Sequence, residues 1–257
     1  MANGSTLRND IPERHNIVCI SFFRFAGPFA RFWALSQMLF ARASMRRLRE
    51  VGFWKLFGSG SGEGFTPLPN TGVYAILTTW PTLEVAQDQI SHMQPFQRYR
   101  DRAAEHWTVY LSTSTSRGQW DDRSPFKPGA PQAGQPLAAL TRATLRPSIL
   151  MQFWKHVPSI SAAIGSDPNV AFKIGLGEVP WFQQVTFSIW PDSDSMAQFA
   201  RRDGPHARAI HAVRKGKWFA EELYARFHIV DQSGSWNGRN PLQSLRLKEP
   251  IRKAVPA

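Results

Sequence analysis

Val73-Tyr-Ala-Ile-Leu-Thr-Thr-Trp-Pro81 and Val185-Thr-Phe-Ser-Ile-Trp-Pro191 are two apolar stretches of this 257-residue chain that end in the same Trp-Pro pair. Both are rich in β-branched and aromatic residues and stop at a proline, a pattern that predicts two buried β-strands. A helical pattern follows each proline, and Thr82 offers the first of these helices an N-cap. The shared strand and its ending indicate that the chain contains one structural unit twice.

On both sides of these two strands, the spacing of apolar residues predicts the same βαββαβ order of elements in each half of the chain. This order is typical of a ferredoxin-like unit. The first half is predicted to have strands over residues 17–25, 53–60, 73–80 and 107–114, helices over 28–48 and 82–92, and helical turns over 95–105. The second half is predicted to have strands over 137–145, 170–174, 183–190 and 224–230 and helices over 148–164, 193–201 and 205–217.

Further identities keep step with this order and support a duplication. They pair Phe32-Trp33 with Phe153-Trp154, the Lys55 segment with the Lys173 segment, His106-Trp107 with Lys217-Trp218, and Gly118-Gln-Trp120 with Gly234-Ser-Trp236. We therefore predict an α+β fold in which tandem duplicated ferredoxin-like (βαββαβ) units form a dimeric α+β barrel-like fold within one chain. The helices would lie outside and the lumen would be apolar. Two domains lying side by side are the alternative.

Composition divides the chain into regions. Residues 1–15 lack an apolar signal core and are expected to be a flexible tail, and residues 116–136 have the Pro, Gly and Gln content of a linker. The N-terminal half then covers 16–115, and the C-terminal half, in which we expect the functional site, covers 137–236. A C-terminal tail over 237–257 follows. A membrane-spanning helix needs about 20 consecutive apolar residues, and no apolar run in the sequence is that long.

The formal net charge of +12 calls for a partner of opposite sign, which is nucleic acid, an anionic membrane face or an acidic protein. No zinc-finger spacing, Arg-Gly repeat or RNP-like motif accompanies the charge, so we expect no nucleic-acid partner. The helix over 28–48 carries Phe29, Phe32 and Phe40 close to Arg42 and Arg46. It is therefore either a helix that touches a membrane surface or a core-packing helix with a solvated basic end.

Cys19 is the only cysteine, which excludes an internal disulfide, a Cys-rich zinc site and a Cys-ligated iron–sulfur cluster. Its surroundings predict a buried strand residue, with ligation of a haem by its thiolate as the alternative. A reducing cytoplasm is the natural compartment for such a chain.

His206 is the histidine that periodicity places toward an interior. Asp203 and the following Gly-Pro predict a helix start, and Ile210 and Val213 follow His206 on the apolar stripe, whereas His211 falls on a basic outer face. His206 is thus either the axial ligand of a haem or a hydrogen-bonded core histidine. The other histidines form no pair with metal-ligand spacing.

Four strings of the second half are distinctive. They are Phe172-Lys-Ile-Gly-Leu-Gly-Glu-Val-Pro180, Gln184-Val-Thr-Phe-Ser-Ile-Trp-Pro-Asp192, Gly204-Pro-His-Ala207 and Trp218-Phe-Ala-Glu-Glu-Leu-Tyr-Ala-Arg-Phe227. Together they resemble the spheroidene monooxygenase family of carotenoid biosynthesis. The similarity extends over roughly residues 16–245 and is densest from residue 137 onward.

The resemblance implies an oxygenase that introduces keto groups into acyclic carotenoids, as in the conversion of spheroidene to spheroidenone, with O2 and external electrons. It also implies a haem cofactor and a barrel-like fold in which a histidine of the C-terminal half holds the iron. On this basis we predict that His206 is the metal ligand and that Ile210 and Lys173 also bind the haem, Lys173 through a propionate.

Two residues are candidates for the oxygen-binding side of the haem. Strand alternation places Gln184 on one face of its predicted strand and Val185 on the other. If the polar face points into the lumen, Gln184 is a hydrogen-bond donor to bound oxygen, and by the same reasoning Arg142 is a second donor.

The sequence therefore predicts a haem-dependent carotenoid monooxygenase in the cytoplasm, peripheral at the inner membrane. An acidic electron-transfer protein, such as a ferredoxin, would suit the basic charge, and so would anionic lipid that holds the substrate. A haem-dependent dehydratase or lyase on the same barrel and a non-enzymatic haem or carotenoid carrier are the alternatives. If His206 does not bind the iron, His211 is the next candidate.

Overall fold

Eight antiparallel strands close into one barrel in the computed structural model, which describes residues 17–61, 66–129, 135–154, 169–201, 218–243 and 245. The order around the barrel is β1-β3-β2-β6-β7-β5-β8-β4. The strands are β1 (Ile17–Arg24), β2 (Trp54–Gly60), β3 (Pro69–Trp80), β4 (Glu105–Gly118), β5 (Leu137–Leu145), β6 (Phe172–Gly177), β7 (Gln183–Trp190) and β8 (Phe219–Gly234). Because β2 pairs with β6 and β4 pairs with β8, both halves share one sheet. The predicted α+β barrel is confirmed, and the alternative of two side-by-side domains is wrong.

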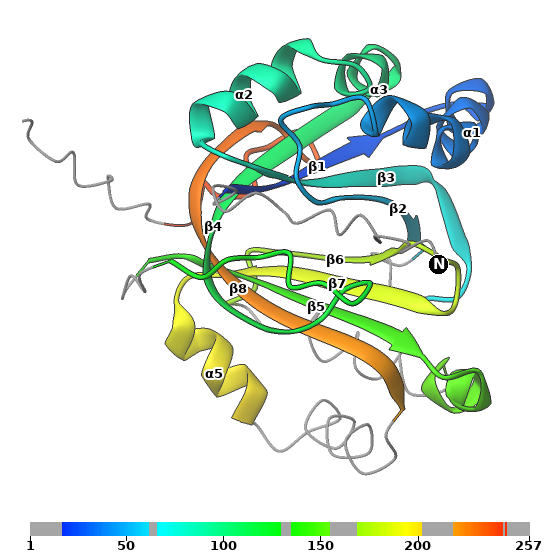
Figure 1. Cartoon of the computed structure of the whole chain (residues 1–257). Helices are drawn as coiled ribbons and strands as arrows, with labels where there is room; N and C mark the ends of the chain where they lie inside the picture. Colours follow the sequence, from blue (N-terminus) through cyan, green and yellow to red (C-terminus); the bar gives the residue numbers. More distant parts are fainter. Residues whose placement is uncertain are drawn as a thin grey trace, which may run out of the picture.

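Helices cover the outside of the barrel (Figure 1). In the described ranges these are α1 (Pro28–Met45), α2 (Leu83–His92), α3 (Phe96–Arg102) and α5 (Ser193–Arg201), and a 3-10 turn, η1 (Pro147–Ile149), follows β5. The first two pack on the strands of the N-terminal half, and α5 packs on β7. Thr82 caps α2 as predicted, since the Val85 N–H donates to its Oγ1 at 3.3 Å. None of the helices in these ranges combines the length and the hydropathy that a membrane crossing requires.

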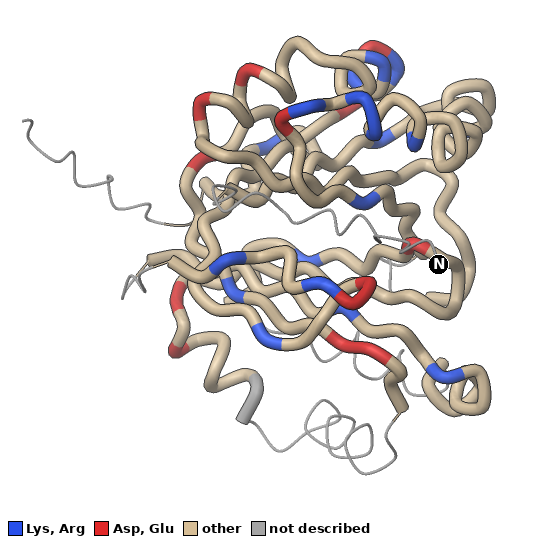
Figure 2. The backbone as a smooth tube through the Cα atoms, in the orientation of Figure 1, with Lys and Arg blue, Asp and Glu red and all other residues tan. Residues whose placement is uncertain are grey.

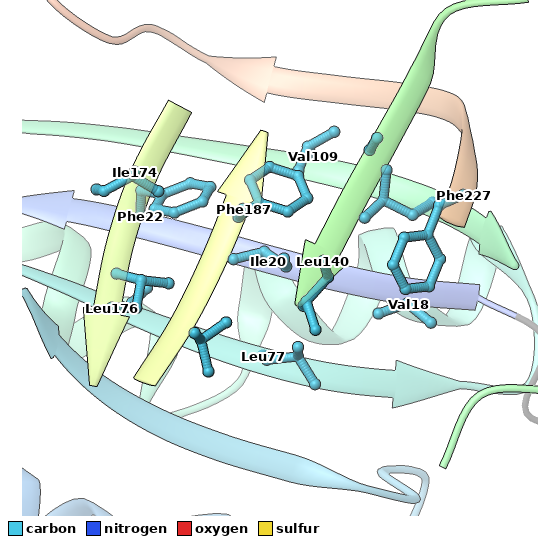
Figure 3. Packing of buried hydrophobic residues seen from close by; sticks show 14 of the residues in the cluster. Val18, Ile20, Phe22, Leu77, Val109, Leu140, Ile174, Leu176, Phe187 and Phe227 are labelled. Atoms are coloured by element: carbon cyan, nitrogen blue, oxygen red, sulfur yellow. The ribbon is translucent and has the colours of Figure 1, made fainter. Parts of the chain in front are cut away.

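Large apolar side chains fill the interior of the barrel. On β1 they are Val18, Ile20 and Phe22, which alternate with outward-facing neighbours as the period of a strand requires. Figure 3 shows side chains from opposing strands meeting there, and Phe22 stacks on Trp107 with ring centroids 5.4 Å apart. Full burial of each such side chain stabilises the fold by about 1.5–3 kcal/mol. The lumen is therefore a packed apolar core.

A second core lies between the outer face of the N-terminal half and the helices above it. Cys19 and Phe23 point into it from β1, and Tyr99 of α3 packs on Phe23 with ring centroids 5.0 Å apart. The side chains that α1 buries are Ala34, Gln37, Ala41 and Met45, of which the two alanines are small. Small side chains let the helix lie close to the sheet.

Two glycines turn the chain at the ends of β4 and β8. Gly118 and Gly234 have φ angles of 94° and 85°, a backbone conformation that residues other than glycine rarely adopt. A Cβ on Gly118 would lie 2.1 Å from the carbonyl oxygen of Glu222, and one on Gly234 would lie 2.3 Å from that of His106. Both positions therefore require glycine, and the predicted match between them holds.

Each of these glycines leads into a short turn that carries an indole into the lumen core. Trp120 packs on Phe53 and Phe126 with ring centroids 5.4 and 6.3 Å away, and Trp236 packs on Phe22 at 6.0 Å. Trp120 and Phe126 belong to the stretch with linker composition, residues 116–136, and both are buried. This stretch thus contributes to the core although it has no periodic apolar pattern.

The two halves also repeat a tryptophan contact. Trp80 Nε1 donates to Thr78 Oγ1 at 2.8 Å, and Trp190 Nε1 donates to Ser188 Oγ at 2.9 Å. The match between the two strands that end in Trp-Pro is therefore present in three dimensions.

The predicted match between Lys55 and Lys173 does not hold. Lys55 is on the lumen side of β2, in alternation with outward-facing Leu56, and its Nζ lies 5.4 Å from the ring centroid of Phe53. Lys173 neighbours the lumen-facing Ile174 on β6, so it points outward. A register difference of one residue reverses the face on which a strand residue lies.

Candidate functional site

Small side chains occupy the centre of the outer face of the C-terminal half. They alternate with lumen-facing residues such as Leu140 and Phe187. We call this set the outer platform, and its members are Ala139, Thr141, Ala143, Gly175, Thr186 and Ser188. Thr141 stands at its centre, because it pairs with Thr186 of β7 on one side and with Tyr224 of β8 on the other.

The side chains at the corresponding place in the N-terminal half are buried. Trp80 and Trp190 occupy equivalent positions, each opposite the first residue of β1 or β5. Counted back from these two tryptophans, Ile76 stands where Thr186 stands in the other half. Ile76 is fully buried, whereas Thr186 is partly exposed.

The same difference in exposure appears between β1 and β5. Ser21 and Phe23 are 1% and 2% exposed, whereas Thr141, which stands where Ser21 does, is partly exposed and Ala143 replaces the ring of Phe23. Side chains at the centre of a sheet are normally covered by the elements that pack on it. Within the described residues, Thr141 and Thr186 are therefore less covered than their equivalents in the N-terminal half.

Lys173 and Gln184 border the outer platform. Lys173 pairs with Ser188, and Gln184 pairs with Gly177. Both side chains are half-buried and both point outward. Gly175 is the next residue after Lys173 on the same face of β6. Because it has no side chain, a ligand could approach the backbone closely there. The structure thus brings these two predicted site residues to one face.

The polar face of β7 points outward, so the condition under which Gln184 was predicted to face a lumen ligand is not met. Val185 and Phe187 take the lumen side of that strand. Arg142 points into the barrel, between Val185 of β7 and Leu223 of β8. The two predicted oxygen-side donors, Gln184 and Arg142, therefore lie on opposite faces of the sheet and cannot both face one ligand.

Arg142 is only 1% exposed and has acidic partners at one end of the lumen. Its guanidinium donates to the Glu221 carboxylate, lies 3.7 Å from Asp121 Oδ1 and stands 5.6 Å from the ring centroid of Trp120. Counted from the first residues of β1 and β5, Phe22 occupies this place in the N-terminal half. A buried guanidinium in an apolar core requires such partners.

Lys55 and Glu178 extend this arrangement. Lys55 Nζ donates to Glu178 Oε2 at 2.8 Å and also pairs with Asp121, and Trp120 Nε1 donates to Glu178 Oε1 at 2.5 Å. We call these charged residues the lumen-end cluster: Lys55, Asp121, Arg142, Glu178 and Glu221. The opposite charges of the cluster pair with one another, and the bond from Trp120 to Glu178 anchors the Trp120 turn over the end of the barrel. Since these charges are already paired, we take the outer platform as the candidate site.

At one end, the outer platform is bordered by α5. Phe199 packs on Trp190 with ring centroids 5.3 Å apart. The Ser195 N–H donates to Asp192 Oδ1 at 2.7 Å, and this hydrogen bond lowers the pKa of Asp192. Asp192 therefore serves as a helix cap.

His228 lies on the same outer face, opposite Leu137 at the end of the sheet, and is not among the site residues predicted from the sequence. It is 7% exposed, and burial lowers its pKa, so the neutral imidazole is favoured. The signal was present in the alternation of Leu223, Ala225 and Phe227, which fill the lumen side of β8.

His206 and Ile210, the predicted iron ligand and its neighbour, lie outside the described residues. Within those residues, no three His, Cys, Asp or Glu side chains are grouped to hold a metal ion. The small side chains of the outer platform would leave room for one face of a planar apolar group such as haem, and its central Thr141 and Thr186 are partly exposed. Lys173 supplies a cation for an acidic substituent at the edge.

Cys19 does not fit the role of a cofactor ligand. It is fully buried under the helices of the N-terminal half, and burial raises the pKa of its thiol well above the ordinary value. We expect the native protein to react with a thiol reagent more than a hundredfold more slowly than the protein in denaturant, as followed by absorbance. Equal rates would contradict this burial.

Solved structures share this fold at very low sequence identity. An aldoxime dehydratase superimposes with a TM-score of 0.56 at 8% identity, over 88% of this chain and 86% of that one. An aldoxime dehydratase in complex with butyraldoxime gives a TM-score of 0.55 at 10% identity, over 85% and 81%. The fold thus defines the class of single-chain α+β barrels with helices on the outside.

Within that class, the sequence determines the family. Spheroidene monooxygenase of Cereibacter sphaeroides is 46% identical over 93% of this chain and 75% of its own length, and that of Rhodobacter capsulatus is 45% identical over 89% and 96%. The enzyme of the same name from Rubrivivax gelatinosus is 32% identical over 82% of both chains. No family model matches the chain. The chain belongs to the spheroidene monooxygenase family and is an oxidoreductase.

Proposed function

We propose that this protein is a haem-dependent monooxygenase that introduces keto groups into acyclic carotenoids, of the type that converts spheroidene to spheroidenone. The observation that carries the proposal is the outer platform, whose central Thr141 and Thr186 are partly exposed while their equivalents in the N-terminal half, Ser21 and Ile76, are buried. Membership of the family supplies the substrate class.

His206 is the proposed axial ligand of the haem iron. The sequence pattern predicts an apolar helical stripe that His206 shares with Ile210, and the Gly-Pro-His string that contains it resembles the family. A ligating imidazole is neutral and donates its second N–H to an acceptor. Lys173 is proposed to pair with a haem propionate, because it points outward beside Gly175.

Haem, when bound, would supply the activation of O2 with electrons from an external donor. Gln184, on the outer face of β7, is the proposed hydrogen-bond donor to bound O2. An amide N–H donates a hydrogen bond and keeps the same charge at every ordinary pH. Arg142 is separated from the platform by the sheet, so we assign it to the lumen-end cluster and not to the chemistry.

The proposed reaction hydroxylates one allylic CH2 group of the polyene twice. Each hydroxylation inserts one oxygen atom of O2 and reduces the other to water with two electrons and two protons. The resulting gem-diol loses water and leaves the ketone. An acidic electron-transfer protein such as a ferredoxin would be attracted to a chain of net charge +12.

The proposed location is the cytoplasm, peripheral at the inner membrane, because the substrate dissolves in lipid and the basic charge favours an anionic leaflet. Nucleic acid has no place in this proposal. We also infer that the barrel consists of tandem duplicated ferredoxin-like units over 16–115 and 137–236, joined by 116–136. The paired glycine turns and the paired tryptophan contacts support this inference.

The experiment that tests the function is the visible spectrum of the protein purified after expression with a haem supply. A Soret band, and conversion of an acyclic carotenoid to its ketone that requires both O2 and a reductant, are expected. Absence of the Soret band would contradict haem dependence. Turnover without reductant would favour the dehydratase or lyase alternative, and binding without any turnover would favour a carrier.

Substitution of the proposed ligand sharpens this test. His206→Ala is expected to remove the Soret band or shift it, and to lower turnover by at least a hundredfold, because an axial ligand is lost. His92→Ala is the matched control, since His92 is exposed at the end of α2, far in sequence from the site. Unchanged haem content and spectrum in His206→Ala would transfer the assignment to His211.

A further inference from the structure

The outward face of α1 is more apolar than the face that it buries. Phe29, Phe32, Leu35, Leu39 and Phe40 are 90%, 75%, 51%, 74% and 69% exposed. Helices that pack on a core normally do the reverse and turn their large apolar side chains inward. On the inner side of α1, Ala34, Ala41 and Met45 pack on the core, so these five large side chains are left exposed to a partner.

This surface continues beyond the helix. A hollow of about 490 Å³ between α1 and the start of β3 is lined by Gly27, Pro28, Arg31, Phe32, Leu35 and Thr71. A few residues before Thr71, Leu68 is 68% exposed, and the neighbouring Trp181, whose Nε1 donates to the Pro67 carbonyl at 2.9 Å, is 52% exposed. Figure 1 shows α1, the start of β3 and the loop between β6 and β7 along one edge of the molecule. Exposed apolar surface of this extent marks an interaction site.

Basic side chains surround the apolar surface. Residues 28–49 contain no Asp or Glu, and their arginines are all exposed: Arg31, Arg42, Arg46, Arg47 and Arg49. On the neighbouring helix α3, the Arg102 guanidinium lies 4.6 Å from the ring centroid of Trp33. Figure 2 shows Lys and Arg gathered at the segment after α1 and on α3.

We propose that this surface, the α1 face, docks on the anionic headgroups and outer acyl chains of a phospholipid bilayer. An apolar helical face flanked by arginines has the chemistry that partitions into a membrane interface. Each arginine near an anionic surface favours binding by about fivefold. A second copy of the chain is disfavoured as the occupant, because pairing two α1 faces would bring together two sets of five exposed arginines, which outnumber the nearby acids Glu50 and Asp101.

The proposal adds a docking surface to the proposed function and does not depend on catalysis. It would bring the barrel to the phase in which a carotenoid dissolves. Binding to lipid can be measured on protein that has no haem and no substrate, so failure of one proposal leaves the other in place.

Vesicle co-sedimentation of the full chain tests it. We expect binding to vesicles of phosphatidylcholine with phosphatidylglycerol, and at least tenfold weaker binding to phosphatidylcholine alone. Phe32→Gln together with Leu39→Gln is expected to weaken binding to the anionic vesicles by at least tenfold, without a change in melting temperature, because both side chains are already exposed. Arg46→Gln together with Arg47→Gln is expected to weaken it by about twentyfold.

Met93→Gln is the matched control, since Met93 is an exposed apolar residue (41%) at the end of α2, and it should bind like the parent protein. Equal binding by the Phe32 and Leu39 double variant would overturn the proposal. A dimer in sedimentation velocity that the same double variant dissociates, without any binding to vesicles, would overturn it in favour of a second copy.

Discussion

Thr141→Trp is expected to prevent haem binding while the protein stays folded. Thr141 stands at the centre of the outer platform and is partly exposed, so an indole there occupies open space and does not overpack a core. If a planar cofactor lies on this face, the same indole takes its place. We expect the affinity for added haem, followed by the Soret absorbance, to fall by at least tenfold, with a melting temperature within a few degrees of the parent.

The control for this substitution is Ala220→Trp, which places the same side chain at an exposed position of β8. It should bind haem like the parent protein. Full haem binding by Thr141→Trp would show that the cofactor lies elsewhere, while leaving the family assignment untouched. This pair of variants tests the position of the site without any substitution of His206.

Glu221→Gln is expected to destabilise the protein by about 3 kcal/mol, because removal of one partner of a buried ion pair leaves the other uncompensated. Arg142 is 1% exposed, and its remaining acidic neighbour, Asp121, is 3.7 Å away. Arg142→Met is expected to cost only about 1 kcal/mol, since Glu221 keeps contact with solvent and methionine suits the apolar lumen. Urea unfolding followed by tryptophan fluorescence gives both values.

The double variant Arg142→Met with Glu221→Gln separates the pair from its single members. We expect it to be more stable than Glu221→Gln alone, because no unpaired charge stays in the barrel. Glu222→Gln, at the exposed neighbouring position, should change the free energy of unfolding by no more than about 0.5 kcal/mol. A double variant as unstable as the sum of the single changes would show that Arg142 and Glu221 act independently.

Element order and barrel class could be predicted from the sequence because apolar periodicity and the repeated Trp-Pro ends carry them. β5 and β7 have the predicted bounds, and β4 and β8 are longer than predicted. The extensions are polar, like the Ser-Thr-Ser-Arg part of β4, and therefore lack an alternation signal. Their pairing comes from contact between two strands far apart in the chain, which a local pattern does not contain.

The faces of the strands were harder to predict than the strands. Both faces of β7 contain β-branched or aromatic residues. Whether Gln184 points into the lumen or outward is therefore decided by the strands that β7 meets across the barrel, which its own sequence does not reveal. The lumen-end cluster was missed because its members are dispersed over the whole chain, from Lys55 to Glu221. The outer platform, by contrast, had a signal in Ala139, Thr141 and Ala143, a run of small residues on one face of a strand.

Closure of the barrel has a consequence for the protein during synthesis. The long pairing of β4 with β8 joins Trp107 to Gly234, so the last of the eight barrel strands to be synthesised completes the barrel wall. Until then, the first four strands present Phe22 and Trp107 on an uncovered inner surface, which invites association with other nascent chains. Contacts so distant in sequence also form slowly. The inner surface of a newly made chain therefore stays exposed to association until β8 has paired with β4 and β5.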